Sequence, residues 1–136
     1  MATASATIDI PASAEQVWQL IGGFHALPDW LPFIASSEST EGGRVRHLQT
    51  VDGAVVVEQL QTFDNAGRTY SYSILQAPFP AKDYLATLRV EALGQGARVT
   101  WSGRFEPVGV SEEEVVALFT GVYEGGLQAL RAHYPA

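Results

Sequence analysis

The sequence predicts an α+β protein in which a curved antiparallel sheet of seven strands wraps around a long C-terminal helix, with two short helices after the first strand. Three observations support this prediction. Six consecutive segments alternate polar with apolar or aromatic residues, as half-buried strands do. Glycine-containing turns separate several of them, which is typical of hairpins. The last quarter of the chain has the three- and four-residue apolar spacing of an amphipathic helix.

The N-terminal part predicts a strand followed by the two short helices. Residues 4–10 alternate polar and apolar side chains and end before a proline, which indicates the first strand. Ser13 and Gln16 have capping-box spacing and predict a helix over 13–21, which ends at two glycines. The segment 24–34 is dense in aromatic residues and prolines, so we expect a short helix and a turn there, at the rim of an internal chamber.

The six further strands are predicted at residues 33–40, 44–50, 54–63, 68–76, 83–93 and 97–106. The turns 51–53 and 65–67 end in glycine, as in three-residue hairpin loops whose last residue has a positive φ, and 94–95 fits a two-residue turn. These turns predict the cross-strand pairs Thr50–Ala54, Leu48–Val56, Arg46–Glu58, Asp64–Arg68, Leu60–Tyr72, Leu88–Trp101 and Tyr84–Phe105. One face of the sheet is then apolar and aromatic, and the other is polar.

A shorter turn would change this register. If Asp52 and Gly53 alone formed the turn, the pairing would slip by one residue and His47 would lie opposite Glu58, an arrangement more typical of catalysis. That slip would also place Leu48 on the face opposite Leu60. The three-residue loop is therefore favoured.

The C-terminal helix is predicted over residues 111–133. Ser111 and Glu114 have capping-box spacing, and three consecutive glutamates lie where the helix dipole is positive. At 1.5 Å of rise per residue the helix would be roughly 33 Å long. Gly125 and Gly126 are unfavourable inside a helix by about 1 kcal/mol each relative to alanine. They indicate either a close backbone approach or a locally weakened part of the helix, where a molecule could enter. The alternative is a glycine-rich loop between two shorter helices.

Composition narrows the classes of partner. The 136 residues are expected to form a single domain, 1–136, without a linker or repeat. Fifteen acidic and eight basic residues give a formal net charge of −7, which disfavours nucleic acids and anionic membrane surfaces. Cysteine is absent and the three histidines lack metal-ligand spacing, so we expect neither a metal nor another cofactor. No apolar run suits a signal peptide or an integral membrane segment, which predicts a cytoplasmic protein. We expect it to be a monomer or a homodimer.

Two charged residues fall on the apolar face of the predicted sheet. Arg46 and Glu58 lie opposite each other on neighbouring strands and are expected to form an ion pair. A buried ion pair adds little net stability, so it would orient a polar group of a ligand or transfer protons. The alternative is an ordinary cross-strand salt bridge near a sheet end.

Four tyrosines bring hydroxyl groups toward the same interior, namely Tyr70, Tyr72, Tyr84 and Tyr123. A buried hydroxyl group without a partner is unfavourable, so these groups are expected to bind each other or a ligand. Alternatively, they are core aromatics whose hydroxyls reach the rim and water.

Several short segments carry a family resemblance: Ile10–Trp18, Trp30-Leu31-Pro32, Gly43–Arg46, Glu58-Gln59-Leu60, Tyr70-Ser71-Tyr72 and Pro80–Tyr84. Together with the element order, they make the whole chain resemble the SRPBCC or START-like superfamily, in particular the bacterial polyketide cyclase/dehydrase and lipid-transport-like group. The resemblance implies the helix-grip fold, which START lipid-binding domains and plant pollen-allergen-type proteins share. The resemblance extends to the inward-facing Arg46 and Glu58, but it implies no established set of catalytic residues for this chain.

Two functions follow from these residues. The first is binding of a small hydrophobic or aromatic ligand, lipid- or polyketide-like, in a cavity between the sheet and the C-terminal helix. The predicted ligand-binding residues are Trp30, Arg46, Glu58, Leu60, Tyr70, Tyr72, Tyr84, Leu88, Trp101, Phe119 and Tyr123. The second is a cofactor-free polyketide cyclase or dehydratase that uses the same cavity, with Glu58 and Arg46 as candidate catalytic residues. A third alternative is a protein-interaction domain with a nearly filled interior.

Overall fold

A computed structural model describes residues 2–134 of the chain. The elements are, in order, β1 (Ala2–Ile10), α1 (Ala14–Ile21), α2 (Leu27–Trp30), β2 (Ile34–Thr40), the 3-10 turn η1 (Glu41–Gly43), β3 (Val45–Thr50), β4 (Val55–Asp64), β5 (Thr69–Gln76), β6 (Ala81–Leu93), β7 (Gly96–Pro107) and α3 (Glu112–Arg131). The strands form one antiparallel sheet in the order β1-β7-β6-β5-β4-β3-β2. The predicted α+β helix-grip architecture is confirmed, and the sheet is open, with β1 and β2 at its edges.

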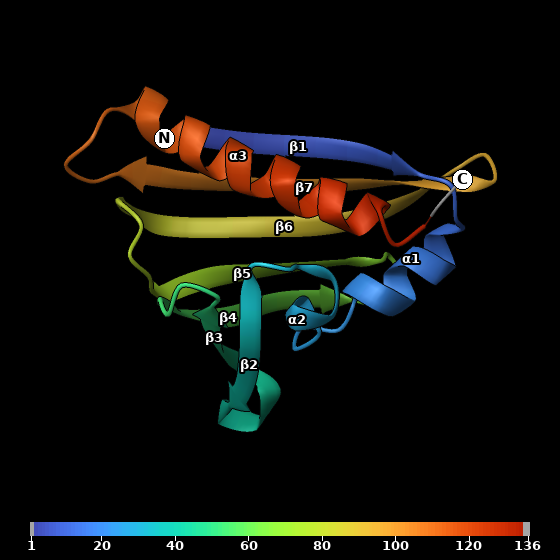
Figure 1. The fold of residues 1–136 in the computed structure, drawn as a ribbon, viewed down its shortest axis with the longest axis horizontal. Coiled ribbons are helices and arrows are strands. Elements are labelled where there is room, and N and C mark those ends of the chain that lie inside the picture. The colour runs from blue at the N-terminus through green and yellow to red at the C-terminus, as the bar shows by residue number, and fades with distance from the viewer. Residues whose placement is uncertain (1, 135–136) are drawn as a thin grey trace.

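The sheet is strongly curved, and α3 lies across its concave face (Figure 1). The strands β1, β7 and β6 run beneath α3, whereas β2 at the opposite edge runs nearly at right angles to them. The helix α3 contacts β1 and β7. The helix α1 contacts β6 and β7. No helix in the described part of the chain is long and apolar enough to span a bilayer.

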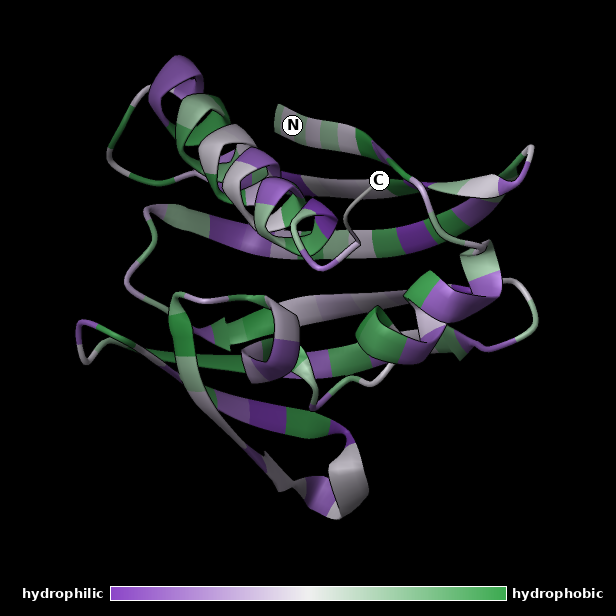
Figure 2. Cartoon of the chain, turned by 45° about the vertical axis from the view of Figure 1, so that its right-hand side comes forward, coloured by the Kyte–Doolittle hydropathy of each residue, from purple (hydrophilic) through white to green (hydrophobic). Residues whose placement is uncertain are grey.

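The core lies between the concave face and the helices. Buried residues alternate with exposed ones along β6 and β7, and Figure 2 shows the alternation as green and purple bands. The largest fully buried side chains include Trp30, Arg46, Tyr70, Phe105, Phe119 and Tyr123. One of these six is a charged arginine, which therefore needs a specific partner.

Most of the predicted register is confirmed. Arg46 pairs with Glu58, and the pairs Leu48–Val56, Leu60–Tyr72 and Leu88–Trp101 are also present. Gly53 has φ +93°, and the Thr50 amide donates to the Ala54 carbonyl oxygen over 2.9 Å, as a three-residue loop requires. The alternative in which His47 faces Glu58 is wrong, since His47 lies opposite Val57.

Two predicted pairs are wrong because the strands contain bulges. Asp64 pairs with Thr69 rather than Arg68, since the loop is one residue longer and its positive φ, 52°, falls on Arg68 instead of the glycine before it. A register shift between Leu60 and Thr62 absorbs the extra residue. Likewise, a shift between Lys82 and Leu85 removes the ladder pair Tyr84–Phe105, although the two rings still stack with centroids 6.1 Å apart.

Small residues on three neighbouring strands make room for α3. Ala4, Gly103 and Ala86 lie side by side on β1, β7 and β6. A Cβ atom on Gly103 would collide with the hydroxyl of Tyr123, which projects from α3, and would lie 3.6 Å from the ring of Tyr84. Glycine is thus needed here for close packing rather than for backbone freedom.

The helix α3 is continuous, so the alternative of two shorter helices is wrong. The Ser111 hydroxyl accepts a hydrogen bond from the Glu114 amide over 3.2 Å, and the helix ends at Arg131, two residues before the predicted end. The two glycines in its middle differ. A Cβ atom on Gly126 would lie 2.7 Å from Trp101 and 2.8 Å from Leu31, whereas one on Gly125 would meet nothing within 4 Å.

This difference predicts opposite effects for two neighbouring alanine substitutions. Gly125→Ala is expected to raise the free energy of unfolding by about 0.5–1 kcal/mol, because alanine is the better helix former and the space is open. Gly126→Ala is expected to lower it by about 1–3 kcal/mol, because the added methyl group forces the Trp101 ring to move. Urea denaturation of both variants measures this. Equal effects of the same sign would contradict the packing of α3 on Trp101.

Candidate functional site

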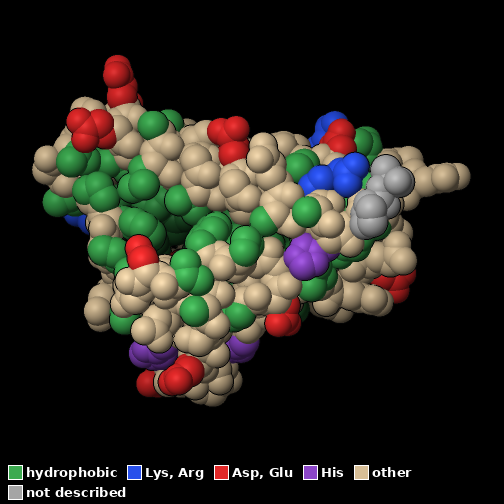
Figure 3. Space-filling model, viewed as in Figure 1, with side chains coloured by type: hydrophobic (Ala, Val, Ile, Leu, Met, Phe, Trp, Pro, Cys, Tyr) green, Lys and Arg blue, Asp and Glu red, His purple; other side chains and the backbone are tan. Residues whose placement is uncertain are grey.

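A pocket of about 330 Å³ lies between the concave face of the sheet and α3. Its apolar walls come from α2 and the segment after it, from β2 to β7, from the segment before β6 and from α3. They include Leu31, Ile34, Leu48, Val56, Ile74, Phe79, Trp101, Phe119 and Val122. Figure 3 shows a hollow with hydrophobic side chains gathered around it, on the left of the view. The volume is at the small end of the range of about 300–1,000 Å³ that small-molecule sites occupy.

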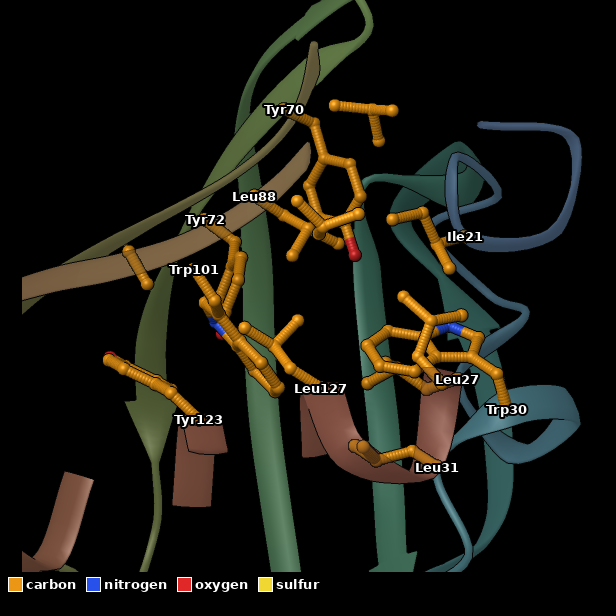
Figure 4. Packing of buried hydrophobic residues seen from close by; sticks show 14 of the residues in the cluster. Ile21, Leu27, Trp30, Leu31, Tyr70, Tyr72, Leu88, Trp101, Tyr123 and Leu127 are labelled. Atoms are coloured by element: carbon orange, nitrogen blue, oxygen red, sulfur yellow. The ribbon is translucent and has the colours of Figure 1, made fainter. Parts of the chain in front are cut away.

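Six of the predicted site residues line this pocket: Glu58, Tyr72, Tyr84, Trp101, Phe119 and Tyr123. They come from four strands and the C-terminal helix, so only the folded sheet brings them together. Tyr72 and Trp101 lie side by side in Figure 4, and the Trp101 Nε1 atom donates to the Tyr72 hydroxyl over 3.0 Å. The indole ring is therefore held in one orientation against the pocket.

Five predicted residues lie outside the pocket lining: Trp30, Arg46, Leu60, Tyr70 and Leu88. Trp30 lies next to Leu27 on α2 in Figure 4 and packs edge-on against Trp101, with centroids 5.9 Å apart. Tyr70 packs edge-on against Phe24, at 5.7 Å. Leu60 and Leu88 belong to the surrounding core. Trp30 packs on the pocket-lining Trp101 and Tyr70 on the pocket-lining Tyr72, so these two rings lie behind the pocket wall.

Sequence reasoning missed the aliphatic half of the wall. Leu48, Val56 and Ile74 line the pocket, and their place in the inward phase of the alternation was a usable signal. Phe79 lines it too and packs edge-on against Phe119, with centroids 5.3 Å apart. It lies in the irregular segment before β6, for which periodicity gives no orientation.

The ion pair lies at the wall of the pocket. The Arg46 Nε and Nη2 atoms lie 2.8 Å and 2.7 Å from Oε1 of Glu58, so both interactions end on the same oxygen. The Arg46 Nη1 atom donates to the Phe24 carbonyl oxygen over 2.6 Å. Arg46 is fully buried and does not reach the pocket, whereas Glu58 does.

Aromatic rings enclose the guanidinium group of Arg46. Its central carbon lies 4.1 Å from the ring centroid of Phe24, 4.8 Å from that of Tyr72 and 5.9 Å from that of Tyr70. Cation–π attraction of this kind strengthens in a desolvated site. The cation is thus held by one carboxylate oxygen, one carbonyl oxygen and three rings.

Burial and the partner charge act in opposite directions on this pair. Burial raises the pKa of the Glu58 carboxyl above its usual value, and the charge and hydrogen bonds of Arg46 offset this only in part. Burial is the largest single influence on Arg46 and would lower its pKa, but the charge of Glu58 together with Tyr70 and Tyr72 outweighs burial, and the pKa is raised. Arg46 therefore stays charged, and Glu58 is its counterion.

Tyrosine hydroxyls form the other polar part of the pocket. The Tyr84 and Tyr123 hydroxyls share one short hydrogen bond. The Tyr72 hydroxyl accepts from Trp101, and no acceptor for its own proton occurs among residues 2–134. The polar residues of the lining are thus Glu58, the three tyrosines, Thr50 and Asp52, and the other lining residues are apolar or aromatic.

The buried tyrosines predict a loss of stability at alkaline pH. Burial raises the pKa of Tyr72 and Tyr84 well above the usual value and also raises the pKa of Tyr123. Above about pH 10 the unfolded chain releases these protons and the native protein keeps them, so stability is present below that pH and falls as pH rises. Three such groups give a slope of roughly 4 kcal/mol per pH unit.

Phenolate absorbance and circular dichroism, recorded together during an alkaline titration, measure this. Tyr72, Tyr84 and Tyr123 are expected to ionise only when the native circular dichroism is lost. Ionisation of all five tyrosines with the native spectrum intact would contradict the burial of these three hydroxyls.

No group of three histidine, aspartate or glutamate side chains in the described chain has a geometry suited to a metal ion. His25 hydrogen-bonds to the Gly43 carbonyl oxygen over 2.9 Å, and His47 to the Thr40 hydroxyl over 3.1 Å. Both histidines are therefore engaged in local contacts. The pocket itself offers apolar surface, hydrogen-bonding hydroxyl groups and the carboxyl group of Glu58.

The chain matches a known protein family and is similar to several solved structures. Residues 1–135 match the model of the family described as polyketide cyclase / dehydrase and lipid transport. No curated protein matches the chain significantly. The chain is similar to solved structures of XoxI from Bacillus cereus (51% identity, TM-score 0.96) and of an uncharacterized protein from Bacillus thuringiensis (50% identity, TM-score 0.96). Each comparison covers 98% of this chain, with 96% of XoxI and 98% of the second protein.

A more distant structure shares the fold. A START superfamily protein from Mycobacterium smegmatis has a TM-score of 0.79 at 19% identity, over 96% of this chain and 95% of its own. At this identity the likeness concerns the fold alone. It agrees with the helix-grip architecture described above.

Proposed function

Because the chain belongs to the polyketide cyclase / dehydrase and lipid transport family, we propose that it binds a small hydrophobic or aromatic molecule in the pocket between the sheet and α3. The observation that carries this proposal is the pocket itself, about 330 Å³ of space with predominantly apolar walls. Few, well-positioned polar groups in an apolar cavity are typical of sites for small molecules. The space also argues against a nearly filled interior, which a pure protein-interaction domain would have.

The rigidity of the walls supports the proposal. Trp101 is held by its hydrogen bond to Tyr72, and it stacks on Tyr123 with centroids 4.8 Å apart. Phe119 packs on Phe105 at 4.7 Å. Because these rings are fixed before a guest enters, little side-chain entropy is lost on binding.

A substitution that fills the pocket tests the proposal. Native mass spectrometry of gently purified protein, with a thermal-shift screen of flavonoids, sterols, fatty acids and polyketides, identifies guests. Val122→Trp places a large ring in the pocket and is expected to abolish the shift caused by any guest found. Val116→Trp is the matched control, since Val116 is also a partly buried valine of α3 but does not line the pocket. No guest across these classes, or equal binding by Val122→Trp, would count against the proposal.

A second candidate function, polyketide cyclase or dehydratase activity, is favoured by one observation. Glu58 is a pocket-lining carboxyl group whose pKa is raised by burial, and general acids and bases have pKa values shifted toward neutrality. Incubation with poly-β-ketone chains, followed by mass spectrometry of the products, tests it. A product made by the unaltered protein and lost in Glu58→Gln, with guest binding retained, would establish catalysis. If the same products form with and without the protein, the catalytic function is rejected and the binding function remains.

A further inference from the structure

Building on the proposed function, we infer that the guest is an uncharged molecule that donates a hydroxyl hydrogen bond to the Oε2 atom of Glu58. The inference concerns the chemical class of the guest. It separates neutral phenols and alcohols from carboxylates such as fatty acids. It follows from how the ion pair is arranged and from which charges surround the pocket.

The two oxygens of Glu58 are used unequally. Both interactions with Arg46, at 2.8 Å and 2.7 Å, end on Oε1. No hydrogen bond to Oε2 occurs among residues 2–134, although the Glu58 side chain is only 9% exposed and lines the pocket. Oε2 is not one of the fully enclosed, unpaired polar atoms of the described chain, so it is open to the pocket. A guest that displaces water from a carboxylate oxygen must supply a donor in its place, and a hydroxyl group does so.

Arg46 cannot serve as an anchor for an anion. Its side chain is 1% exposed, and its three nitrogens are directed at Glu58 and at the Phe24 carbonyl oxygen. The rings of Phe24 and Tyr72 cover its faces. A guest carboxylate therefore meets Glu58, not the arginine behind it.

The remaining charges around the pocket also disfavour an anion. Among the residues that the structure describes, the lining includes two acidic residues, Asp52 and Glu58, and no lysine, arginine or histidine. A carboxylate guest would lose its hydration there without gaining a cation. Since Glu58 already neutralises Arg46, a cationic guest gains no unpaired counterion at Glu58 either. A neutral hydroxyl donor fits both conditions.

Three matched aromatic probes test the inference on the unaltered protein. Isothermal titration near neutral pH compares 2-naphthol, which donates a hydrogen bond, with 2-methoxynaphthalene, which cannot, and with 2-naphthoate, which is anionic. We expect 2-naphthol to bind at least about tenfold more tightly than 2-methoxynaphthalene, the usual size of a hydrogen bond to a charged acceptor. We expect 2-naphthoate to bind most weakly.

A double variant shows whether Glu58 causes the difference. Glu58→Leu alone leaves a buried arginine unpaired, so the variant combines Arg46→Met with Glu58→Leu, which removes both charges and keeps similar volumes. Its circular dichroism and thermal unfolding report on folding. In the folded double variant, the preference for 2-naphthol over 2-methoxynaphthalene is expected to fall to about twofold or less.

The outcomes separate this inference from the proposed function. Equal binding of 2-naphthol and 2-methoxynaphthalene, or tightest binding of 2-naphthoate, would overturn the hydroxyl-donor inference and leave the pocket as a site for apolar guests. A preference that persists unchanged in the double variant would also overturn it. Failure of all three probes to bind, or binding unaffected by Val122→Trp, would overturn both.

Discussion

Glu58→Leu is expected to lower the free energy of unfolding by about 3–5 kcal/mol, although it replaces a buried charge with an apolar side chain. The reason is Arg46, which is fully buried and receives its only carboxylate contact in the described chain from Glu58. Without that contact the guanidinium retains the Phe24 carbonyl oxygen and the surrounding rings, which do not neutralise its charge. The destabilisation therefore comes from an uncompensated cation rather than from lost attraction alone.

Urea denaturation, analysed at constant m-value, measures the effect. The double variant Arg46→Met/Glu58→Leu is expected to recover most of the lost stability, because it removes the cation as well. The matched control is Glu91→Leu, which breaks an exposed 3.8 Å ion pair with Arg89 and is expected to change stability by no more than about 1 kcal/mol. A loss below about 1 kcal/mol for Glu58→Leu would mean that water reaches Arg46.

The juxtaposition of this pair was predictable from local signals. Gly53 at the third loop position determines the hairpin type, and a period of two then places Arg46 opposite Glu58. The polar and apolar phases agree with the same register, so a one-residue slip would have exposed the apolar face. Where turn chemistry and alternation agree, the sequence alone predicts which side chains meet.

The bulges were not predictable in this way. Register shifts lie next to Gln61 and Asp83, and neither position has a glycine to mark it. A positive φ at Asp83 accompanies the second shift. The prediction therefore failed for Tyr84–Phe105 as a ladder pair while remaining right about which face carries the two rings.

The sequence also did not allow us to predict which inward-facing residues line the pocket and which belong to the core. Tyr70 and Tyr72 share one phase of β5, yet Tyr72 lines the pocket and Tyr70 packs beside Arg46. The distinction depends on α1 and the segment after it, because Trp18 and Phe24 pack against Tyr70. Both residues are distant from Tyr70 in the sequence, so the alternation along β5 does not reveal this packing.

Phe119→Ala is expected to lower the free energy of unfolding by about 3–5 kcal/mol, the usual loss for a buried aromatic residue. Phe119 is 2% exposed and lies with its ring centroid 4.7 Å from that of Phe105, 4.9 Å from Tyr84 and 5.3 Å from Phe79. It connects α3 to β6, β7 and the segment before β6. The rings of its neighbours are held by one another, so the space cannot collapse and the full loss is expected. Leu118→Ala, at a neighbouring exposed position of the same helix, is the control and is expected to change stability by no more than about 0.5 kcal/mol.

Because Phe119 also lines the pocket, the substitution enlarges the space available to a guest. Naphthalene, which has no polar group, is expected to bind the Phe119→Ala protein and to restore part of the lost stability, about 2.7 kcal/mol at a free concentration one hundred times its dissociation constant. Thermal unfolding with and without naphthalene measures this recovery. Destabilisation without recovery would mean that the new space is closed off from the pocket. A loss of less than about 1 kcal/mol would instead mean that the N-terminal half of α3 does not pack on the aromatic side chains of the sheet.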